Sequence, residues 1–278
     1  YLTEKGAEVL HLSRNENLAA QYPAYKWDIK NGYIDPRALE VDHIIHLAGA
    51  GVADSRWTKK RKEEIYNSRI DSTRLIVNQV KAHKVKLKSF VCASAVGIYG
   101  ADSGEKLVDE EAAPANDFLA QVVQDWEKEA AQIKGVPVSM VRIGIVLSNE
   151  GGALPKMTMP VKFGVGAPLG SGVQYMSWIH VDDLVSMIAY MMSEKLEGAY
   201  NAVAPSPVNN KEFTKQIGKV MHRPVWLPNV PGFLLKAALG EMSQVVLGGN
   251  RVSSEKIRQQ GFVFTYKELR PALENILS

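Results

Sequence analysis

The sequence predicts an α/β protein with a doubly wound parallel sheet and a smaller, mostly helical lobe toward its carboxyl end. Short apolar runs return at intervals through residues 1–150, and amphipathic helical patterns separate them. A segment rich in Gly, Pro and Met follows at 151–178. Strands that are buried on both faces are continuous apolar runs, and helices between such strands favour a parallel sheet covered on both sides.

The apolar runs place the expected strands in order. They lie at Glu8–Leu12, Tyr25–Trp27, 42–50 (DHIIHLAGA), 89–95 (SFVCASA) and 136–147 (VPVSMVRIGIVL). The intervening patterns predict helices over Lys59–Ala82 and Asp117–Lys134. In the second helix the apolar positions are three and four residues apart, as an amphipathic helix requires: Leu119, Val122, Val123, Trp126 and Ala130.

The change in composition beyond Leu147 predicts the domain organisation. We expect a dinucleotide-binding domain over 1–150 and a loop-rich, helical lobe over 151–278 that receives the substrate. A helix from about Asp182 to Ser193 and a strand near 200–203 are expected to complete the first domain. Three or four short helices are expected between Asn210 and Leu277.

The first residues, YLTEKGAEVLHL, have the pattern of a helix end followed by a strand. Gly6 comes after the helical stretch Tyr1–Lys5, and glycine is the usual left-handed helix terminator. In a Rossmann-like βαβ unit, a first strand and a glycine-rich phosphate loop come before that helix. We therefore expect about twenty further residues ahead of Tyr1, which would supply the missing central strand and phosphate loop.

The end of the second strand distinguishes NAD from NADP in such units. An acidic residue there binds the ribose 2′-hydroxyl of NAD, whereas an arginine pairs with the 2′-phosphate of NADP. The residues here are Ser13 and Arg14, and charge-assisted hydrogen bonds are worth ~1.5–3 kcal/mol each. The position therefore predicts NADP(H) as the cofactor. Asp28, after the next strand, is expected either to contact the adenine or to form a turn.

Composition excludes several other classes of function. The net charge is +3, and the densest basic run, Lys59–Lys62, is followed at once by two glutamates, as on a solvated helix face. The single cysteine, Cys92, rules out a disulfide framework and a cysteine-based metal site. No apolar run approaches the ~18 residues of a membrane span. We expect a cytoplasmic protein that binds a small molecule and has no metal, membrane or nucleic-acid site.

Seven segments carry a resemblance to a known family. The chain is similar to the uncharacterised "epimerase family" proteins, an atypical branch of the extended short-chain dehydrogenases/reductases with a C-terminal domain of unknown function. The segments are HLAGAGVADSRWT (46–58), NSRIDST (67–73), SAVGIYG (94–100), DFLAQVVQDWEKEA (117–130), RIGIVLSNEGGALPKM (142–157), PLGSGVQYMSWIHVDDL (168–184) and GFVFTYKEL (261–269).

The resemblance implies a Rossmann domain that binds NADP beneath a smaller lobe. The cofactor contacts that it implies are Ser13, Arg14, Leu47, Ala48, Glu64, Arg69 and Val146. Glu64 and Arg69 have an alternative reading, because they are five residues apart on one expected helix and would also suit a loose surface pair. The polar and aromatic residues of the matching loops are candidates for the substrate cleft: Arg56, Trp57, Ser94, Lys156, Trp178 and His180.

The catalytic set of the wider superfamily does not carry over. Its members use a Ser or Thr, a Tyr, and a Lys four residues after the Tyr. The Tyr and Lys positions fall on Leu119 and Val123, which transfer no proton, and the Ser/Thr position falls on Ala95. Ser94 lies one step away and faces the other side of its strand unless the backbone bulges.

Two functions remain open from the sequence. The first is an NADP(H)-dependent oxidoreductase or epimerase-like enzyme that acts on an unidentified small molecule. The second is a non-catalytic NADP-binding regulator. His180 and the following Asp182 and Asp183 have the order of metal ligands, but capping of the next helix by an aspartate is the better interpretation. The sequence names neither the substrate nor the oligomeric state.

Overall fold

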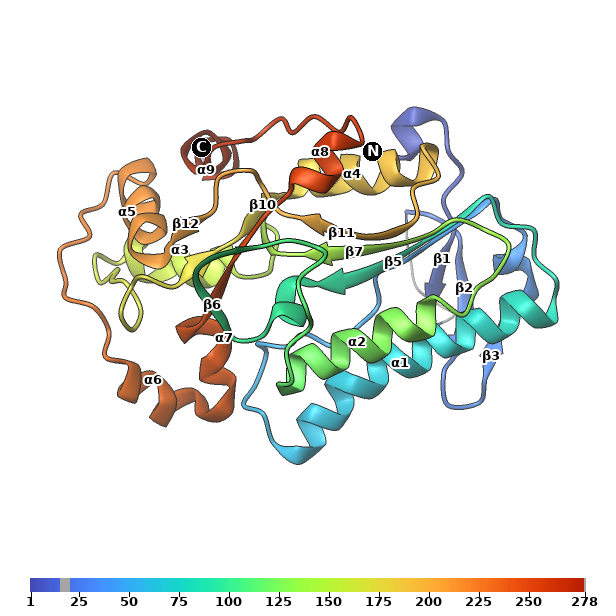
Figure 1. Cartoon of the computed structure of the whole chain (residues 1–278), viewed down its shortest axis with the longest axis horizontal. Coiled ribbons are helices and arrows are strands. Elements are labelled where there is room, and N and C mark those ends of the chain that lie inside the picture. Colours follow the sequence, from blue (N-terminus) through green and yellow to red (C-terminus); the bar gives the residue numbers. More distant parts are fainter. Residues whose placement is uncertain (16–20, 278) are drawn as a thin grey trace.

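The computed structural model describes residues 1–15 and 21–277, and a four-stranded parallel sheet lies at its centre (Figure 1). The strand order is β11–β7–β5–β4. These strands are Gly198–Ala202, Val138–Ile143, Ser89–Ala95 and His43–His46. The middle strand β5 is buried along almost its whole length, which confirms that its apolar run belongs to a sheet covered on both faces.

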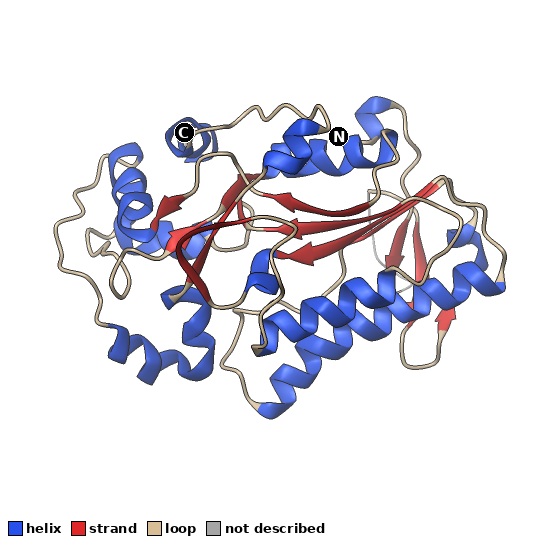
Figure 2. Cartoon of the chain, in the orientation of Figure 1, coloured by secondary structure: helices blue, strands red, loops and turns tan. Residues whose placement is uncertain are grey.

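A second sheet holds the first strands of the chain. β1 (His11–Ser13) pairs in parallel with β2 (Ala24–Asp28), and β3 (Tyr33–Ile34) runs antiparallel beside β2. Within the described residues, β1 and β4 do not pair with each other. The sheet of β1, β2 and β3 is therefore separate from the four-stranded main sheet (Figure 2). The expectation of a strand between them concerns residues outside the printed sequence and stays a prediction.

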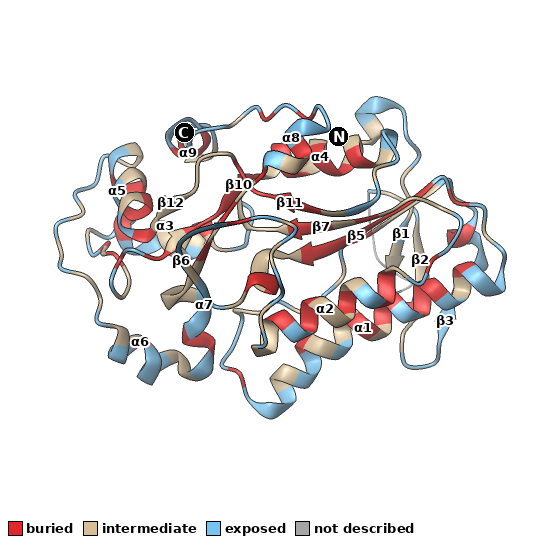
Figure 3. Ribbon diagram, viewed as in Figure 1, coloured by how far each residue is buried: buried red, intermediate tan, exposed pale blue. Residues whose placement is uncertain are grey.

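Helices cover both faces of the main sheet, which confirms the doubly wound architecture. α1 (Lys59–Ala82) and α2 (Phe118–Ala130) pack on one face, and α4 (Val181–Ser193) and α8 (Glu255–Gln259) lie on the other (Figure 1). Each face has its own cluster of buried apolar side chains. Along α1, α2 and α4, buried residues alternate with exposed ones, as in helices that pack one side against a sheet (Figure 3).

Local signals explain where the two long helices begin. Thr58 and Asp117 precede them, and each side chain accepts a hydrogen bond from the third residue of its helix, Arg61 and Ala120. The helical start of the chain is instead a short 3-10 turn, η1 (Thr3–Lys5). Gly6 ends it with a φ of +84°, the left-handed geometry that its sequence position predicts.

The apolar run at 136–147 is one expected strand but forms two. Gly144 lies between β7 and β8 (Ile145–Leu147), and a side chain at Gly144 would collide with the backbone carbonyl of Ser177. β8 leaves the main sheet and pairs in parallel with β10 (Trp178–His180). The break directs the chain from the Rossmann sheet into the carboxyl-terminal lobe.

The carboxyl-terminal lobe holds more regular structure than its composition predicts. The expected loop at 151–178 contains a helix, α3 (Leu154–Lys162), and a strand, β9 (Tyr175–Met176), which pairs with β12 (Val208–Asn209). Beyond residue 209, five described α-helices take the place of the three or four expected. They are α5 (Asn210–Val220), α6 (Gly232–Leu239), α7 (Gln244–Leu247), α8 and α9 (Leu269–Leu277).

Two further strands join distant parts of the chain. β6 (Asp102–Val108) pairs with β13 (Gly249–Val252). The remaining described turns of 3-10 helix are η2 (Pro36–Leu39), η3 (Val96–Tyr99) and η4 (Gly240–Ser243). Through the β6–β13 pair, the loop after β5 is tied directly to the lobe.

Candidate functional site

The candidate site lies where the parallel strands end. In open α/β sheets, ligands bind outside the carboxyl ends of the strands. Here those ends are the residues after β1, β4, β5 and β8, and the 47–58 loop after β4 leads directly into α1. The sequence-predicted cofactor contacts lie along this edge, apart from Glu64 and Arg69 on α1. Asp28 is the last residue of β2, which runs parallel to β1.

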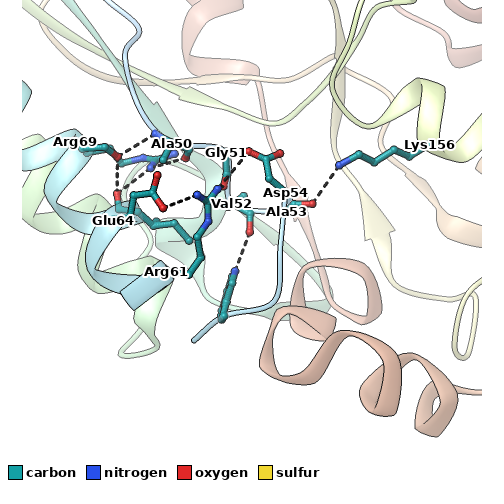
Figure 4. A network of polar contacts seen from close by, with 12 residues as sticks. Ala50, Gly51, Val52, Ala53, Asp54, Arg61, Glu64, Arg69 and Lys156 are labelled. Atoms are coloured by element: carbon teal, nitrogen blue, oxygen red, sulfur yellow. Dashed lines mark hydrogen bonds and ion pairs between the residues drawn. The ribbon is translucent and has the colours of Figure 1, made fainter. Parts of the chain in front are cut away.

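Arg69 holds the glycine-containing part of the 47–58 loop (Figure 4). One of its Nη atoms donates to the carbonyl oxygens of Ala50, at 3.0 Å, and Ile65, at 2.9 Å. A Cβ at Gly49 would lie 3.1 Å from the guanidinium carbon, so glycine allows the loop to rest on this side chain. Burial, together with the nearby charge of Arg61, lowers the pKa of Arg69.

Arg61 forms the second anchor of this loop. It donates to the Gly51 carbonyl, to Asp54 at 3.3 Å and to Glu64 at 2.7 Å. Glu64 therefore pairs with Arg61, and the alternative of a loose pair with Arg69 is not what the structure shows. Arg69 instead lies over the Trp126 ring, 5.2 Å from its centre.

Ser13 and Arg14, at the predicted adenosine end of the site, make few contacts with the rest of the described chain. Ser13 Oγ accepts a hydrogen bond from the Asn15 amide at 3.0 Å, and Arg14 is exposed. Arg14 forms no hydrogen bond or ion pair within residues 1–15 and 21–277. The Asp28 carboxylate accepts from the amides of Lys30 and Asn31, so the structure favours the turn among its two sequence readings.

The apolar candidates lie on either side of the sheet edge. Leu47 is 56 % exposed at the end of β4, where it offers apolar surface to a ligand. Ala48 packs partly against the cluster beneath α1 and α2, and Val146 against the cluster beneath α4. A ligand along these positions would meet backbone and small apolar side chains.

Three cleft candidates gather where the 47–58 loop meets the lobe. Lys156 reaches from α3 and donates to the Ala53 carbonyl at 3.1 Å (Figure 4). Arg56 donates to the Ala237 carbonyl on α6. Trp57 donates through its indole to the Val52 carbonyl at 2.8 Å. These contacts place Arg56, Trp57 and Lys156 around the junction of the 47–58 loop with α3 and α6, which is called the mouth below.

The other three cleft candidates are buried elsewhere. Trp178 is fully buried and donates to the Ser206 carbonyl at 3.1 Å. His180 stacks on Tyr266 with the ring centres 3.9 Å apart, and its Nε2 lies 3.0 Å from the Asn275 side-chain oxygen. Ser94 is also buried, inside a polar network described below. The structure offers none of them to an open cleft.

The residue that caps α4 is His180, whereas an aspartate was expected. Its Nδ1 accepts a hydrogen bond from the Asp182 amide, so the histidine is the cap and the aspartate is not. Asp183 accepts from the amides of Thr265 and Tyr266, at 2.8 and 2.9 Å. The expectation that an aspartate caps this helix is therefore wrong, because the Asp183 carboxylate instead fixes the segment before α9.

Comparisons with known proteins identify the family of the chain. Residues 1–203 match the model of the NAD dependent epimerase/dehydratase family. The chain belongs to this family. Residues 230–276 match a second model, described as a domain of unknown function, DUF1731. The resemblance seen in the sequence is thereby confirmed, and the C-terminal helices α6 to α9 fall within the second model.

Relatives of known sequence or structure extend over the whole chain. The "Epimerase family protein YfhF" of Bacillus subtilis is 39 % identical over 100 % of this chain and 92 % of its own length. The "Epimerase family protein SDR39U1 homolog, chloroplastic" of Arabidopsis thaliana is 41 % identical over 84 % of this chain and 68 % of its own. The crystal structure of human epimerase family protein SDR39U1 with NADPH superposes with a TM-score of 0.89, at 28 % identity, over 99 % of this chain and 92 % of that one.

In this member of the family, apolar side chains fill the positions expected for the catalytic Tyr and Lys. Leu119 packs against a cluster of Trp57, Ile65 and Met242. Val123 belongs to another cluster, with Ile98 and Val203 among its neighbours. The structure thus agrees with the sequence that neither position supplies a proton.

A buried polar network lies beside these positions, and sequence reasoning missed most of it. Ser94 Oγ donates to Glu127 at 2.5 Å, and Arg142 donates twice to the same carboxylate. Arg142 also donates to the Tyr99 hydroxyl at 3.1 Å, and that hydroxyl donates to Asn201 at 2.7 Å. Burial raises the pKa of Tyr99 to about 12. The Tyr99 hydroxyl therefore keeps its proton at pH 7 and donates it to a hydrogen bond within the protein.

His46 is a second buried titratable group that sequence reasoning missed. It ends β4, and its Nε2 lies 3.1 Å from the Ser72 hydroxyl. Burial lowers the pKa of His46 to about 4, so the ring is neutral at pH 7. Its position at a strand end was the available signal, but an apolar strand does not reveal whether its histidine is buried.

An open cavity of about 470 Å³ lies between α1, α2 and η4. Lys62 and Glu241 pair across it, and its aromatic lining comes from Trp57, Tyr66 and Phe118. Across residues 1–15 and 21–277, no group of three His, Cys, Asp or Glu side chains is placed to hold a metal ion. None of the helices in that part of the chain is both long and apolar enough to cross a bilayer.

Proposed function

We propose that the protein binds NADP(H) and acts on a small molecule as an oxidoreductase or epimerase-like enzyme. Arg14 carries this proposal. It lies at the carboxyl end of β1, exposed, with no bonding partner in the described part of the chain. A guanidinium there is suited to bind the 2′-phosphate that distinguishes NADP from NAD. The human relative was crystallised with NADPH, which supports the choice.

The residues along the sheet edge fit a dinucleotide. Ser13 and Arg14 would hold the adenosine phosphate, and the backbone of 47–51 would lie along the cofactor because Ala48, Gly49 and Gly51 leave it accessible. Leu47 and Val146 would contact its apolar surfaces. When bound, the nicotinamide would supply or accept a hydride. The neutral His46 keeps the end of β4 without charge at pH 7.

A second candidate is a non-catalytic NADP-binding regulator. The observation that favours it is the apolar packing of Leu119 and Val123, together with the Tyr99 hydroxyl that is bonded within the protein. General acid–base catalysis contributes about 10²–10⁴-fold to many reactions. A protein without a proton donor at this place would therefore suit cofactor binding without turnover.

One experiment separates the two candidates. Binding of NADPH and NADH to the full-length protein is measured first, by fluorescence titration. Oxidation of NADPH is then followed over a panel of ketones, aldehydes and keto acids. Turnover with any compound rejects the regulator, and tight NADPH binding without turnover supports it. Failure to bind either dinucleotide contradicts both candidates.

The compartment and the partner belong to the same proposal. The free thiol of Cys92 is buried, and burial raises its pKa, so it stays protonated and unreactive. We assign the protein to the reducing cytoplasm and take a small molecule as its partner. Fractionation of cells that express a tagged full chain tests the compartment.

A further inference from the structure

We infer that the substrate is an anion, a carboxylate or a phosphate ester, and that the Lys156 ammonium binds its negative group at the mouth, where the 47–58 loop meets α3 and α6. This inference rests on the proposed function, because it concerns the substrate of the same site. It is carried by the position of Lys156, by the partners of the neighbouring charges, and by the internal hydrogen bonds of the buried polar groups near the same edge.

Lys156 spans the two sides of the mouth. α3 follows β8, and the 47–58 loop follows β4, so both begin at the carboxyl ends of parallel strands. The Lys156 side chain crosses between them and donates to the Ala53 carbonyl at 3.1 Å (Figure 4). A small molecule that enters between the loop and the lobe would therefore pass this ammonium.

Some of the positive side chains that contact the 47–58 loop have no carboxylate partner. Arg61 binds both carboxylates of the loop region, Asp54 and Glu64. Within the described residues, Arg69 and Lys156 have backbone carbonyls as their hydrogen-bond partners and no carboxylate within ion-pair distance. Carbonyl dipoles compensate the charge of the half-buried Arg69 only in part, whereas water solvates the exposed Lys156 and an anion would replace that water with a charge-assisted hydrogen bond.

Arg56 adds to this excess of positive charge. It is exposed and donates to the Ala237 carbonyl on α6, and no acidic side chain of the described chain pairs with it. Lys62, in the first turn of α1, is already paired with Glu241. Arg56 and Lys156 are therefore two cations without a carboxylate partner where the 47–58 loop meets α6 and α3.

Lys156 retains the capacity to bind a ligand. An ammonium has three N–H donors, and the Ala53 carbonyl accepts one of them. The side chain is exposed, so the remaining donors are open to solvent or to a ligand. A charge-assisted hydrogen bond to a carboxylate or phosphate would favour an anionic substrate over a neutral analogue by roughly ten- to a hundredfold.

The other polar groups near this edge have partners within the protein. Ser94 and Tyr99 belong to the Glu127–Arg142 network, and His46 contacts Ser72. His180 is occupied by Asn275 and the Asp182 amide. Among the ionisable cleft candidates, Lys156 and Arg56 therefore keep exposure and free donors, and Lys156 is the one that belongs to α3 and contacts the 47–58 loop.

The test uses matched pairs of carbonyl compounds. Pyruvate is compared with hydroxyacetone, and glyceraldehyde 3-phosphate with glyceraldehyde. The full-length protein is saturated with NADP⁺ for the binding measurements and supplied with NADPH in place of NADP⁺ for the turnover assay. Calorimetry measures the dissociation constants, and NADPH oxidation gives KM and kcat separately. We expect the anion of at least one pair to bind roughly ten- to a hundredfold more tightly. The first pair reports a carboxylate, and the second a phosphate.

Variants at two lysines of α3 test whether Lys156 causes the preference for the anion. Lys156→Met is expected to remove the preference for the anion, and Lys156→Arg to retain part of it. Lys162→Met is the matched control, because Lys162 is exposed at the other end of the same helix. This control should keep the preference. Lys156→Gln provides a second neutral variant if the methionine lowers the unfolding temperature.

The outcomes distinguish this inference from the proposed function. Absence of NADPH binding contradicts the proposed function. Normal NADPH binding with equal affinity for both members of each pair overturns the inference alone. An anion preference that survives in Lys156→Met also overturns it, and so does the absence of binding for all four compounds when NADPH still binds.

Discussion

The Arg142 guanidinium and the Glu127 carboxylate meet through two parallel hydrogen bonds, Nε to Oε1 and Nη2 to Oε2, each 2.9 Å long. The two side chains are only 9 % and 15 % exposed. Burial opposes the charge on Arg142, yet the carboxylate outweighs burial and keeps the pKa of Arg142 raised. The pair joins α2 to β7 through the interior of the Rossmann domain.

Removal of one partner of this pair should destabilise the protein strongly. Arg142→Met leaves the Glu127 carboxylate buried without its cation, and we expect the free energy of unfolding to fall by about 3–5 kcal/mol. Urea unfolding, followed by circular dichroism, measures the change. The double variant E127L/R142M removes both charges and should lose less than Arg142→Met alone. A loss equal to the sum of the two single losses would contradict this account.

His46 should make stability depend on pH. The ordinary histidine pKa is 6.5, and burial lowers that of His46 to about 4. Between these values the unfolded chain binds a proton that the folded chain does not, so stability is full above pH 6.5 and decreases as the pH falls toward 4. The decrease amounts to about 3 kcal/mol for this group.

A variant without the imidazole isolates this effect. His46→Leu should show a shallower decline of the free energy of unfolding between pH 6.5 and 4.5 than the unmodified protein. His83→Leu is the control, because His83 is exposed after the end of α1, and its decline should match the unmodified protein. Equal slopes for all three proteins would show that His46 titrates normally.

The sequence predicted the elements that local patterns determine. α1 spans Lys59–Ala82 as expected, because its apolar spacing and the Thr58 cap lie within the segment itself. β5 spans Ser89–Ala95 as expected, since a continuous apolar run is visible without knowledge of its neighbours. The family resemblance also lies in contiguous segments, and it extended the prediction to the fold as a whole.

Features that depend on distant residues were not predictable in this way. The β6–β13 pair joins segments about 150 residues apart, and α3 has so much Pro and Gly around it that its pattern indicated a loop. The network of Ser94, Glu127 and Arg142 draws its members from three separate elements. Burial also divides the residues proposed for the cleft, because Lys156 is exposed and Trp178 is buried, and no spacing in the sequence reveals this difference.

Gly144 should tolerate no side chain. A Cβ there would collide with the Ser177 carbonyl and lie 2.8 Å from a methyl of Val203. We expect Gly144→Ala to lower the free energy of unfolding by about 1–3 kcal/mol through overpacking. Gly151→Ala is the control, because no atom lies within 4 Å of its added Cβ. Denaturant unfolding compares the two, and equal stability would contradict the collision expected at Gly144.

Arg14 should decide between the two dinucleotides. If its guanidinium binds the 2′-phosphate, Arg14→Ala removes charge-assisted hydrogen bonds that only NADPH makes, and NADPH affinity should fall tenfold or more. NADH has a hydroxyl in place of that phosphate, so its affinity should change little. Arg258→Ala is the matched control, because Arg258 lies on α8 in a surface pair with Glu255. Fluorescence titration with both dinucleotides gives the ratio, and an equal loss of affinity for NADPH and NADH would remove the proposed role of Arg14, whatever the reaction of the protein.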